Sequence, residues 1–235
     1  MRRSRVIILV ACLLFTVVVV TIVAGPLMLR SFFYPKPRGL PPVVPETTEQ
    51  LLARLQIVLE SNAPVVARSL QPGLSDAQIS ELESQGGFRL SSDLRALYRW
   101  RNGLPTNSIV GLLPGQRFVP LEEATQERSL IRQQSGVAFK IFAGHRKGWL
   151  RVLDDGAGDG YFYDPERSDS QGAFFFHFAE VGEYLWFPSL RNFLSGVIEC
   201  YQTQAVKMAA DGKNIDEDAE RTEKIWGRLG KSKGS

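Results

Sequence analysis

The sequence predicts an α+β domain, with a mixed or antiparallel sheet flanked by helices, preceded by one transmembrane helix. Amphipathic segments at helical spacing occupy much of residues 46–134, whereas aromatic, strand-like segments separated by Gly, Asp and Ser clusters occupy residues 149–178. A last amphipathic segment follows. Helices, hairpin-linked strands and a closing helix in this order are typical of an α+β fold. The membrane helix is predicted by an uncharged apolar run near the N-terminus.

This apolar run, residues 6–29, contains 24 residues without a charged side chain. Its first 19 residues would form about 28 Å of helix, close to the thickness of the hydrocarbon core of a bilayer. A cleaved signal peptide is the alternative, but its apolar region is usually about 7–15 residues long and ends at a small-x-small site. Bulky Ile22 stands two residues before Ala24, where such a site needs a small residue. We therefore expect a retained, single-pass anchor in the lipid bilayer.

The segments around this run are assigned from charge and composition. Residues 1–5 are a basic flank, and residues 30–45 are a proline-rich linker that favours extended geometry. Residues 46–210 are expected to form the domain and residues 211–235 a polar, mostly solvated tail on which Ile225 and Trp226 dock. Basic residues flank both ends of the span, so the positive-inside bias only leans toward an internal N-terminus with the domain outside the cytoplasm.

The charge balance excludes an electrostatic footprint for nucleic acid. The chain has 28 basic and 25 acidic residues, and four of the basic ones (Arg2, Arg3, Arg5 and Arg30) flank the apolar run. The remaining 24 leave residues 31–235 with a net charge of −1, so no nucleic-acid partner is expected. Two cysteines in different environments, Cys12 and Cys200, also exclude a disulfide framework and a cysteine-rich zinc module.

Capping residues mark the starts of the predicted helices. Thr47 or Thr48 can cap a helix over residues 46–62, and Ser75 forms a capping box with Gln78. A helix over residues 93–103 is expected to open at Ser91 or Ser92 and to end at Asn102-Gly103. Two further helices are expected over residues 121–134, with Leu130 and Ile131 buried, and over residues 190–206, capped by Ser189. A strand is expected near residues 109–113.

Residues 148–164, GWLRVLDDGAGDGYFYD, place four aspartates and four glycines between apolar stretches. A calcium loop beginning at Asp154 would need oxygen ligands at positions that hold glycine here, and a Glu where proline stands. A dinucleotide-binding loop would lead into a helix, but a strand follows. The segment therefore predicts a hairpin whose glycines accept positive φ and whose aspartates accept bonds from backbone amides. A weak ion site at Asp155 and Asp159 is the alternative.

Residues 88–103, FRLSSDLRALYRWRNG, resemble the helix and Asn-Gly segment of the SUKH superfamily, the Smi/Knr-type domains. Residues 149–164 resemble the strand–Gly-Asp–strand hairpin of that family, and residues 172–178 and 187–201 match its next strand and closing helix. Each motif is short, but their order and spacing agree over roughly residues 46–205. The chain departs from the family at Ser91, where proline is frequent, and in its membrane anchor, since many members are soluble and intracellular.

The resemblance implies an α+β scaffold without conserved catalytic chemistry, whose members bind other proteins. Many bacterial members are immunity proteins that neutralise toxins, and fungal members regulate cell-wall synthesis. By this resemblance, Gly158 and Asp159 hold the hairpin and Asn102-Gly103 terminates the preceding helix. These are structural assignments, and no cofactor is implied.

An enzyme is the competing class. Cys200 and His177 could form a nucleophile pair, but the apolar closing helix around Cys200 favours an inert, buried thiol. His177 lies in an aromatic strand, and His145 is expected to be a solvated turn residue. No spacing selects a pair for glycoside cleavage among the carboxylates Glu122, Glu123, Asp154 and Asp164. We expect no catalytic residues and no metal ligands.

A binding surface has a positive signal in the strand AFFFHF, residues 173–178, which is apolar or aromatic on both faces. If helices cover both faces, these side chains are core. If one face is open, they form an aromatic patch of the kind that dominates protein interfaces. On the second alternative, we expect exposed anchors at Tyr161, Tyr163, Trp186 and Phe187.

The sequence thus predicts a non-enzymatic, membrane-anchored protein-binding domain, of the immunity type that neutralises a toxin. A structural or regulatory envelope protein involved in wall synthesis is the first alternative, and a hydrolase is the second.

Overall fold

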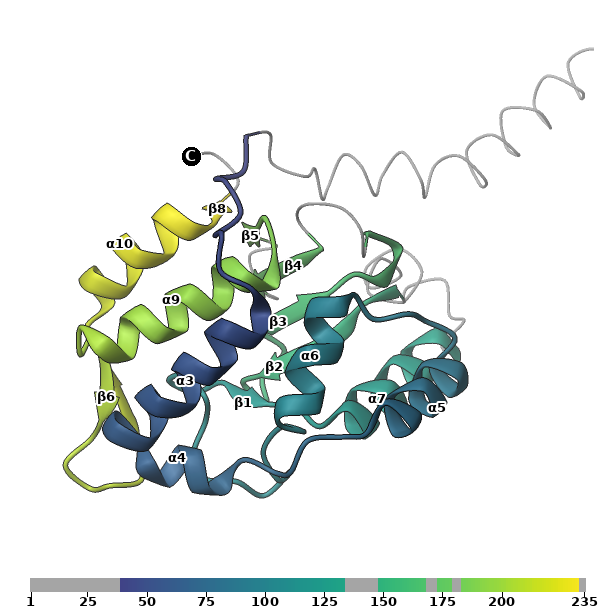
Figure 1. Cartoon of the computed structure of the whole chain (residues 1–235), viewed down its shortest axis with the longest axis horizontal. Coiled ribbons are helices and arrows are strands. Elements are labelled where there is room, and N and C mark those ends of the chain that lie inside the picture. Colours follow the sequence, from purple (N-terminus) through teal and green to yellow (C-terminus); the bar gives the residue numbers. More distant parts are fainter. Residues whose placement is uncertain (1–38, 134–147, 168–172, 179–182, 233–235) are drawn as a thin grey trace, which may run out of the picture. The chain divides into compact units, whose positions relative to one another are not determined.

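Residues 39–133, 148–167, 173–178 and 183–232 are described by a computed structural model, in which helices pack against a six-stranded sheet (Figure 1). All of these residues belong to one compact unit. The predicted basic flank and membrane helix lie outside the described residues, as do His145 and most of the proline-rich linker.

The five predicted helices are present: α3 (Thr48–Asn62), α5 (Asp76–Gly86), α6 (Ser92–Trp100), α7 (Leu121–Gln133) and α9 (Leu190–Gln202), which ends before the predicted bound at residue 206. The described residues also form helices that were not predicted, namely α4 (Pro64–Ser69), the short 3₁₀ helix η2 (Pro165–Arg167) and α10 (Ala219–Leu229).

Local capping explains the helix starts. Thr47 caps α3 in a capping box, in which the Gln50 amide donates to Thr47 Oγ1 at 3.3 Å and the Thr47 amide donates to Gln50 Oε1 at 2.9 Å. Ser75 and Gln78 form the predicted capping box at α5. Gly87, with φ of 60°, ends α5 in the left-handed conformation that glycine adopts without strain. The predicted caps Ser91 and Ser189 are likewise confirmed for α6 and α9.

Six strands form one antiparallel sheet in the order β1-β2-β3-β4-β5-β8. They are β1 (Arg117–Phe118), β2 (Leu150–Asp154), β3 (Gly160–Tyr163), β4 (Phe174–Phe178), β5 (Glu183–Phe187) and β8 (Lys231–Ser232), and a separate hairpin pairs β6 (Val206–Met208) with β7 (Ile215–Glu217). The mixed α+β class and the antiparallel sheet agree with the prediction. The strand expected near 109–113 is wrong, because this stretch is a loop with one bridge from Leu113 to Gln116.

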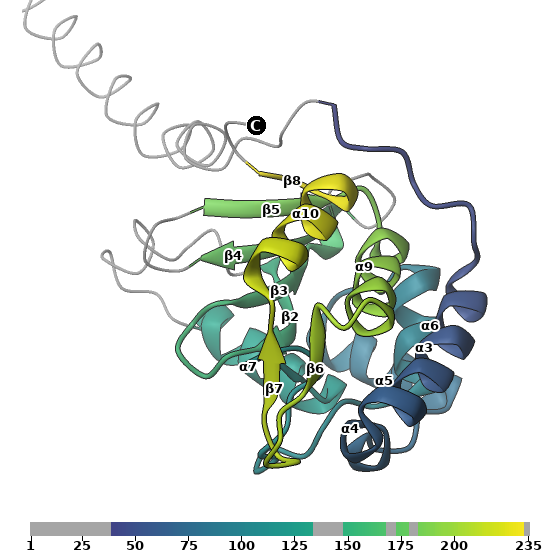
Figure 2. The same ribbon diagram turned by 90° about the vertical axis from the view of Figure 1, so that its left-hand side faces the viewer.

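Helix α9 covers one face of the sheet. The Phe193 ring of α9 lies 4.6 Å from the Tyr161 ring and 4.9 Å from the Phe174 ring, measured between centroids. Figure 2 shows α3, α6 and α9 together on this side. On the other face, Trp149 meets Phe175 edge-on at 4.7 Å, and α7 packs against β2.

This coverage overturns the expectation that four aromatic side chains are exposed. Tyr161, Tyr163, Trp186 and Phe187 are between 0% and 6% exposed. The Tyr163 hydroxyl is also fixed, because it accepts a hydrogen bond from the Ser91 amide at 2.9 Å. Tyr161, Tyr163 and Phe187 lie on the face that α9 covers, and Trp186 lies on the other face beside Phe175. Both faces are packed, so none of the four is an exposed anchor.

Helix α7 differs from its predicted burial. Leu130 is 56% exposed and Ile131 is only half-buried, and the buried side chains of the helix are Leu121, Ala124, Thr125 and Arg128. The guanidinium of Arg128 donates to the Gly86 carbonyl at 2.5 Å and the Gly148 carbonyl at 3.0 Å. A buried arginine therefore takes the position that an apolar pattern would assign to leucine.

The chain on both sides of the predicted domain packs onto α9. The Asn192 side chain donates to the Pro42 carbonyl at 3.0 Å and accepts from the Val44 amide at 3.3 Å, so the end of the linker is docked. Residues 211–235, expected as a solvated tail, instead contribute β7, α10 and β8. The predicted docking of Ile225 and Trp226 is confirmed: Ile225 is 5% exposed, and the Trp226 ring stacks on Phe193 at 5.7 Å.

Candidate protein-binding groove

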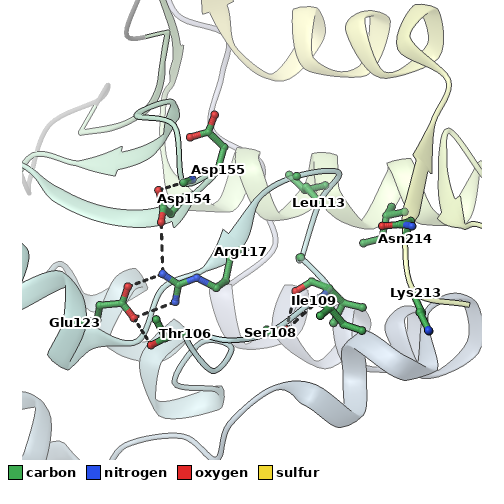
Figure 3. A pocket seen from close by; sticks show the side chains of 15 residues that line it. Thr106, Ser108, Ile109, Leu113, Arg117, Glu123, Asp154, Asp155, Lys213 and Asn214 are labelled. Atoms are coloured by element: carbon green, nitrogen blue, oxygen red, sulfur yellow. Dashed lines mark hydrogen bonds and ion pairs between the residues drawn. The ribbon is translucent and has the colours of Figure 1, made fainter.

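A groove of about 520 Å³ opens where three separate stretches of the chain meet (Figure 3). One wall comes from the β2–β3 loop and the start of α7, and another from the β6–β7 hairpin. The loop between α6 and β1 lies between them. The lining residues are Thr106, Ser108–Gly111, Leu113, Gly115, Arg117, Glu123, Asp154–Gly156 and Lys213–Ile215.

Arg117 holds the first wall together. Its guanidinium forms two bonds with Glu123, at 2.5 and 3.0 Å, and a longer one with Asp154 at 3.4 Å. Figure 3 shows Arg117 directed toward these carboxylates, with Lys213 and Asn214 on the opposite side of the groove. Burial by itself lowers the pKa of Arg117, but the hydrogen bonds and charges of Glu123 and Asp154 outweigh it and raise the pKa. The arginine is therefore a permanently charged brace for the wall.

Asp154 is held ionised by its neighbours. Burial acts to raise its pKa, but the Gly156 amide, Arg151 and Arg117 outweigh burial and lower the pKa below the usual range. Arg151 also pairs with Glu127 at 2.8 Å. The pKa of Glu127 is raised by burial, and the negative charges of its neighbours add to the rise against the opposing effect of Arg151.

The β2–β3 loop has the predicted hairpin chemistry. Asp155 Oδ1 accepts from the Ala157 amide at 2.8 Å and the Gly158 amide at 3.0 Å, and Asp154 Oδ1 accepts from the Gly156 amide at 3.0 Å. Gly156 and Gly158 have φ of 78° and 117°, which side-chain-bearing residues rarely adopt. Asp159 closes the loop, because its carbonyl accepts from the Asp155 amide at 3.3 Å.

The loop between α6 and β1 is fixed at both ends. The Leu104 amide donates to the Phe118 carbonyl at 2.7 Å, and the buried Tyr201 hydroxyl donates to the Leu112 carbonyl at 2.9 Å. Between these points, Ile109 is 74% exposed at the rim of the groove. The loop thus presents an apolar side chain on a fixed backbone.

Asn102 and Gly103 position this loop relative to α7. The Asn102 side chain accepts from the Leu121 amide at 2.9 Å and donates to Glu122 at 2.8 Å, so it caps the start of α7. Gly103 has φ of 74°, and a Cβ atom there would lie 2.6 Å from the Pro120 nitrogen. The sequence assigned this pair to the end of α6, and the structure adds the link to α7.

The candidate nucleophile is enclosed. Cys200 is 0% exposed, and burial raises the pKa of its thiol to about 12. His177 is 2% exposed and lies among aromatic rings, 5.6 Å from Trp149 by ring centroids. In the described part of the chain, no cluster of three or more His, Cys, Asp or Glu residues could hold a metal ion.

Comparison with known families gives a match over residues 73–196 to the SMI1 / KNR4 family (SUKH-1), which is more than half of the chain. The chain belongs to the SMI1 / KNR4 family. A search of curated proteins found no match. The first wall and the loop between α6 and β1, whose lining residues run from Thr106 to Gly156, lie within the matched region, whereas the second wall, Lys213–Ile215, lies outside it. This SMI1 / KNR4 domain therefore completes its groove with a hairpin that follows the family match.

The sequence did not single out Ile109, Arg117 or Lys213. Glu123 was considered as a catalytic carboxylate, and Asp154 as a catalytic carboxylate and as the start of a calcium loop. The structure places both in one wall beside Arg117. Ile109 stands between Ser108 and Val110 in an apolar stretch that was predicted to be a strand, so its exposure in a loop was not predicted. Among the residues described, no helix is sufficiently long and apolar to cross a bilayer, and the predicted span at 6–29 lies outside them.

Proposed function

We propose that this chain is a non-enzymatic, membrane-anchored protein-binding protein of the immunity type, which binds and neutralises a toxin. The observation that carries the proposal is membership of the SMI1 / KNR4 family over residues 73–196. The groove gives the proposal a location, because it is an open cavity with fixed walls and an exposed apolar rim.

The chemistry of the site favours binding over turnover. The carboxylates Glu123 and Asp154 are already paired with arginine, which lowers their capacity to act as general acids. The thiol of Cys200 is buried and protonated at neutral pH, so it is a poor nucleophile.

The anchor is proposed from residues 6–29, and the domain is proposed to lie outside the cytoplasm. Tethering raises the effective concentration of a binding domain at the surface where its partner arrives, without any new contact. Protease protection in intact cells tests this part separately: digestion of the domain from outside is expected, and full protection would contradict the proposed side.

The binding proposal is tested by crosslinking the full-length chain in its own membranes and identifying the crosslinked proteins. The matched control is residues 1–45 fused to an unrelated soluble domain, which removes partners of the anchor alone. Recovery of one small protein, whose toxicity the full-length chain suppresses on co-expression, is the expected result. A growth or wall defect on deletion, without any such toxin, would instead favour the envelope-protein alternative. Hydrolytic turnover lost on changing His177 or Cys200 would refute the proposal.

A further inference from the structure

We propose that the groove binds an extended segment of the partner protein that carries an arginine or lysine beside an apolar residue. The basic side chain would lie against the wall formed by Glu123, Asp154 and Asp155, and the apolar one against Ile109. This inference rests on the proposed function, since it names the chemistry of the partner at the same site.

The wall belongs to a network of paired charges with a negative excess. Glu123 and Asp154 of the wall and Glu127 behind it supply three carboxylates, whereas Arg117 of the wall and Arg151 behind it are the two cations that pair with them. Both arginine side chains are only 14% exposed, so their positive charges are paired with carboxylates inside the network. One negative charge remains in excess.

Asp155 adds a second negative charge at the groove. Its Oδ1 is used by the Ala157 and Gly158 amides, and within the described residues no hydrogen bond reaches its Oδ2. The carboxylate is therefore held in place by the loop while one oxygen stays available. A fixed, partly exposed carboxylate acceptor is complementary to a guanidinium or an ammonium group.

The groove also has an apolar rim. Ile109 is 74% exposed on a backbone that is fixed on both sides of it, and half-buried Ile215 lies in the facing hairpin. Burying these side chains against an apolar side chain of a partner removes apolar surface from water and so favours binding. An acidic wall next to an apolar rim selects a segment that carries both kinds of side chain.

The opposite wall of the groove carries a positive charge. Lys213 is exposed on the β6–β7 hairpin, across the groove from Arg117 and the carboxylates (Figure 3). A positive charge on one wall and a negative excess on the other orient a bound segment, with its cation toward Asp155. The cavity of about 520 Å³ is within the size range of sites that enclose an organic ligand, and it is larger than an ion needs.

The experiment uses two fluorescein-labelled nine-residue peptides of Gly and Ser that differ at one central position, with Ile-Arg in one and Ile-Glu in the other. Binding to the full-length chain is measured by fluorescence anisotropy at low and at 0.5 M salt. We expect the arginine peptide to bind about fivefold more tightly or better at low salt, and the difference to shrink at high salt. Equal affinities of the two peptides would overturn the inference.

Two variants locate the site. Asp155→Asn keeps an oxygen that can accept the Ala157 and Gly158 amides but removes the charge, so it should weaken the arginine peptide about twofold to fivefold. Ile109→Ser should weaken both peptides. The matched control is Asp76→Asn, a charge removal at a mostly exposed aspartate outside the groove, which should change neither affinity. Equal effects of Asp155→Asn and Asp76→Asn would contradict the proposed position.

The two proposals fail in different ways. A toxin partner that crosslinks to the chain while the two peptides bind equally would leave the proposed function standing and remove this inference. Selective binding of the arginine peptide, without any protein partner in the membrane crosslinking experiment, would leave this inference standing and remove the proposed function.

Discussion

Replacing Gly196 in α9 tests how the C-terminal helix is held. A Cβ atom at this position would lie 2.2 Å from Trp226 Cζ3 and 2.8 Å from Cε3. The indole has little room to retreat, because it stacks on Phe193 at an interplanar angle of 9° and meets Phe187 edge-on at 5.7 Å. Gly196→Ala therefore inserts a methyl group into a filled space.

Two opposing effects set the size of the change. Replacing glycine by alanine inside a helix stabilises the helix by about 1 kcal/mol. Forcing a methyl group into a packed contact costs about 1–3 kcal/mol. The clash wins, so we expect the free energy of unfolding to fall by about 1 kcal/mol and the melting temperature to fall by about 2–4 °C.

The sign should reverse when the ring is removed. In a Trp226→Ala background the clash disappears, and Gly196→Ala should raise the free energy of unfolding by about 1 kcal/mol. The matched control is Gly227→Ala in α10, where an added Cβ would meet nothing within 4 Å, so that change should be stabilising in either background. Urea unfolding of the full-length chain, followed by far-UV circular dichroism, measures all the variants. An equal stabilisation by Gly196→Ala with and without Trp226 would refute the packing of α10 on α9.

Three further predictions concern buried polar groups. Glu83 is 2% exposed and accepts hydrogen bonds from the Leu90 amide, Arg89 and Arg95, so Glu83→Ala should lower the free energy of unfolding in urea titrations by about 3–5 kcal/mol. The control Glu81→Ala, at an exposed glutamate of the same helix, should change it by under about 0.5 kcal/mol. Similar changes for the two variants would argue against a buried role for Glu83. Tyr201→Phe removes the hydroxyl that donates to the Leu112 carbonyl, so it should lower the free energy of unfolding by about 1–2 kcal/mol and speed amide hydrogen exchange in the loop between α6 and β1. An unchanged exchange rate would count against this hydrogen bond as the link that holds the loop. Because burial raises the pKa of Cys200 to about 12, its thiol stays protonated at pH 8, and iodoacetamide should modify it only after the chain unfolds. Mass spectrometry of the peptide that contains Cys200 measures the modification, and rapid labelling of the folded chain would contradict the burial.

The sequence by itself determined features whose causes lie within a few residues. The capping boxes at Thr47 and Ser75 use a side chain and an amide three residues apart, so their pattern is readable directly. The Asp-Gly hairpin is equally local, because Asp155 bonds amides two and three residues ahead of it. These signals placed the helices and the central hairpin, and with them the α+β class.

Only the tertiary structure decided which faces are covered and which segments meet. Alternation along β3 assigns Tyr161 and Phe162 to opposite faces of the sheet. Whether each face is covered depends on helices distant in sequence, which the prediction did not decide. In the structure, both faces are covered and both residues are buried. The groove has the same origin: Ile109, Asp155 and Lys213 come from three stretches that no sequence spacing relates. Likewise, the Trp226 ring docks in the space left by the missing side chain of Gly196, thirty residues earlier in the chain. Hydrogen bonds of a turn or cap are fixed by the local chain, whereas burial is a property of everything packed around a residue.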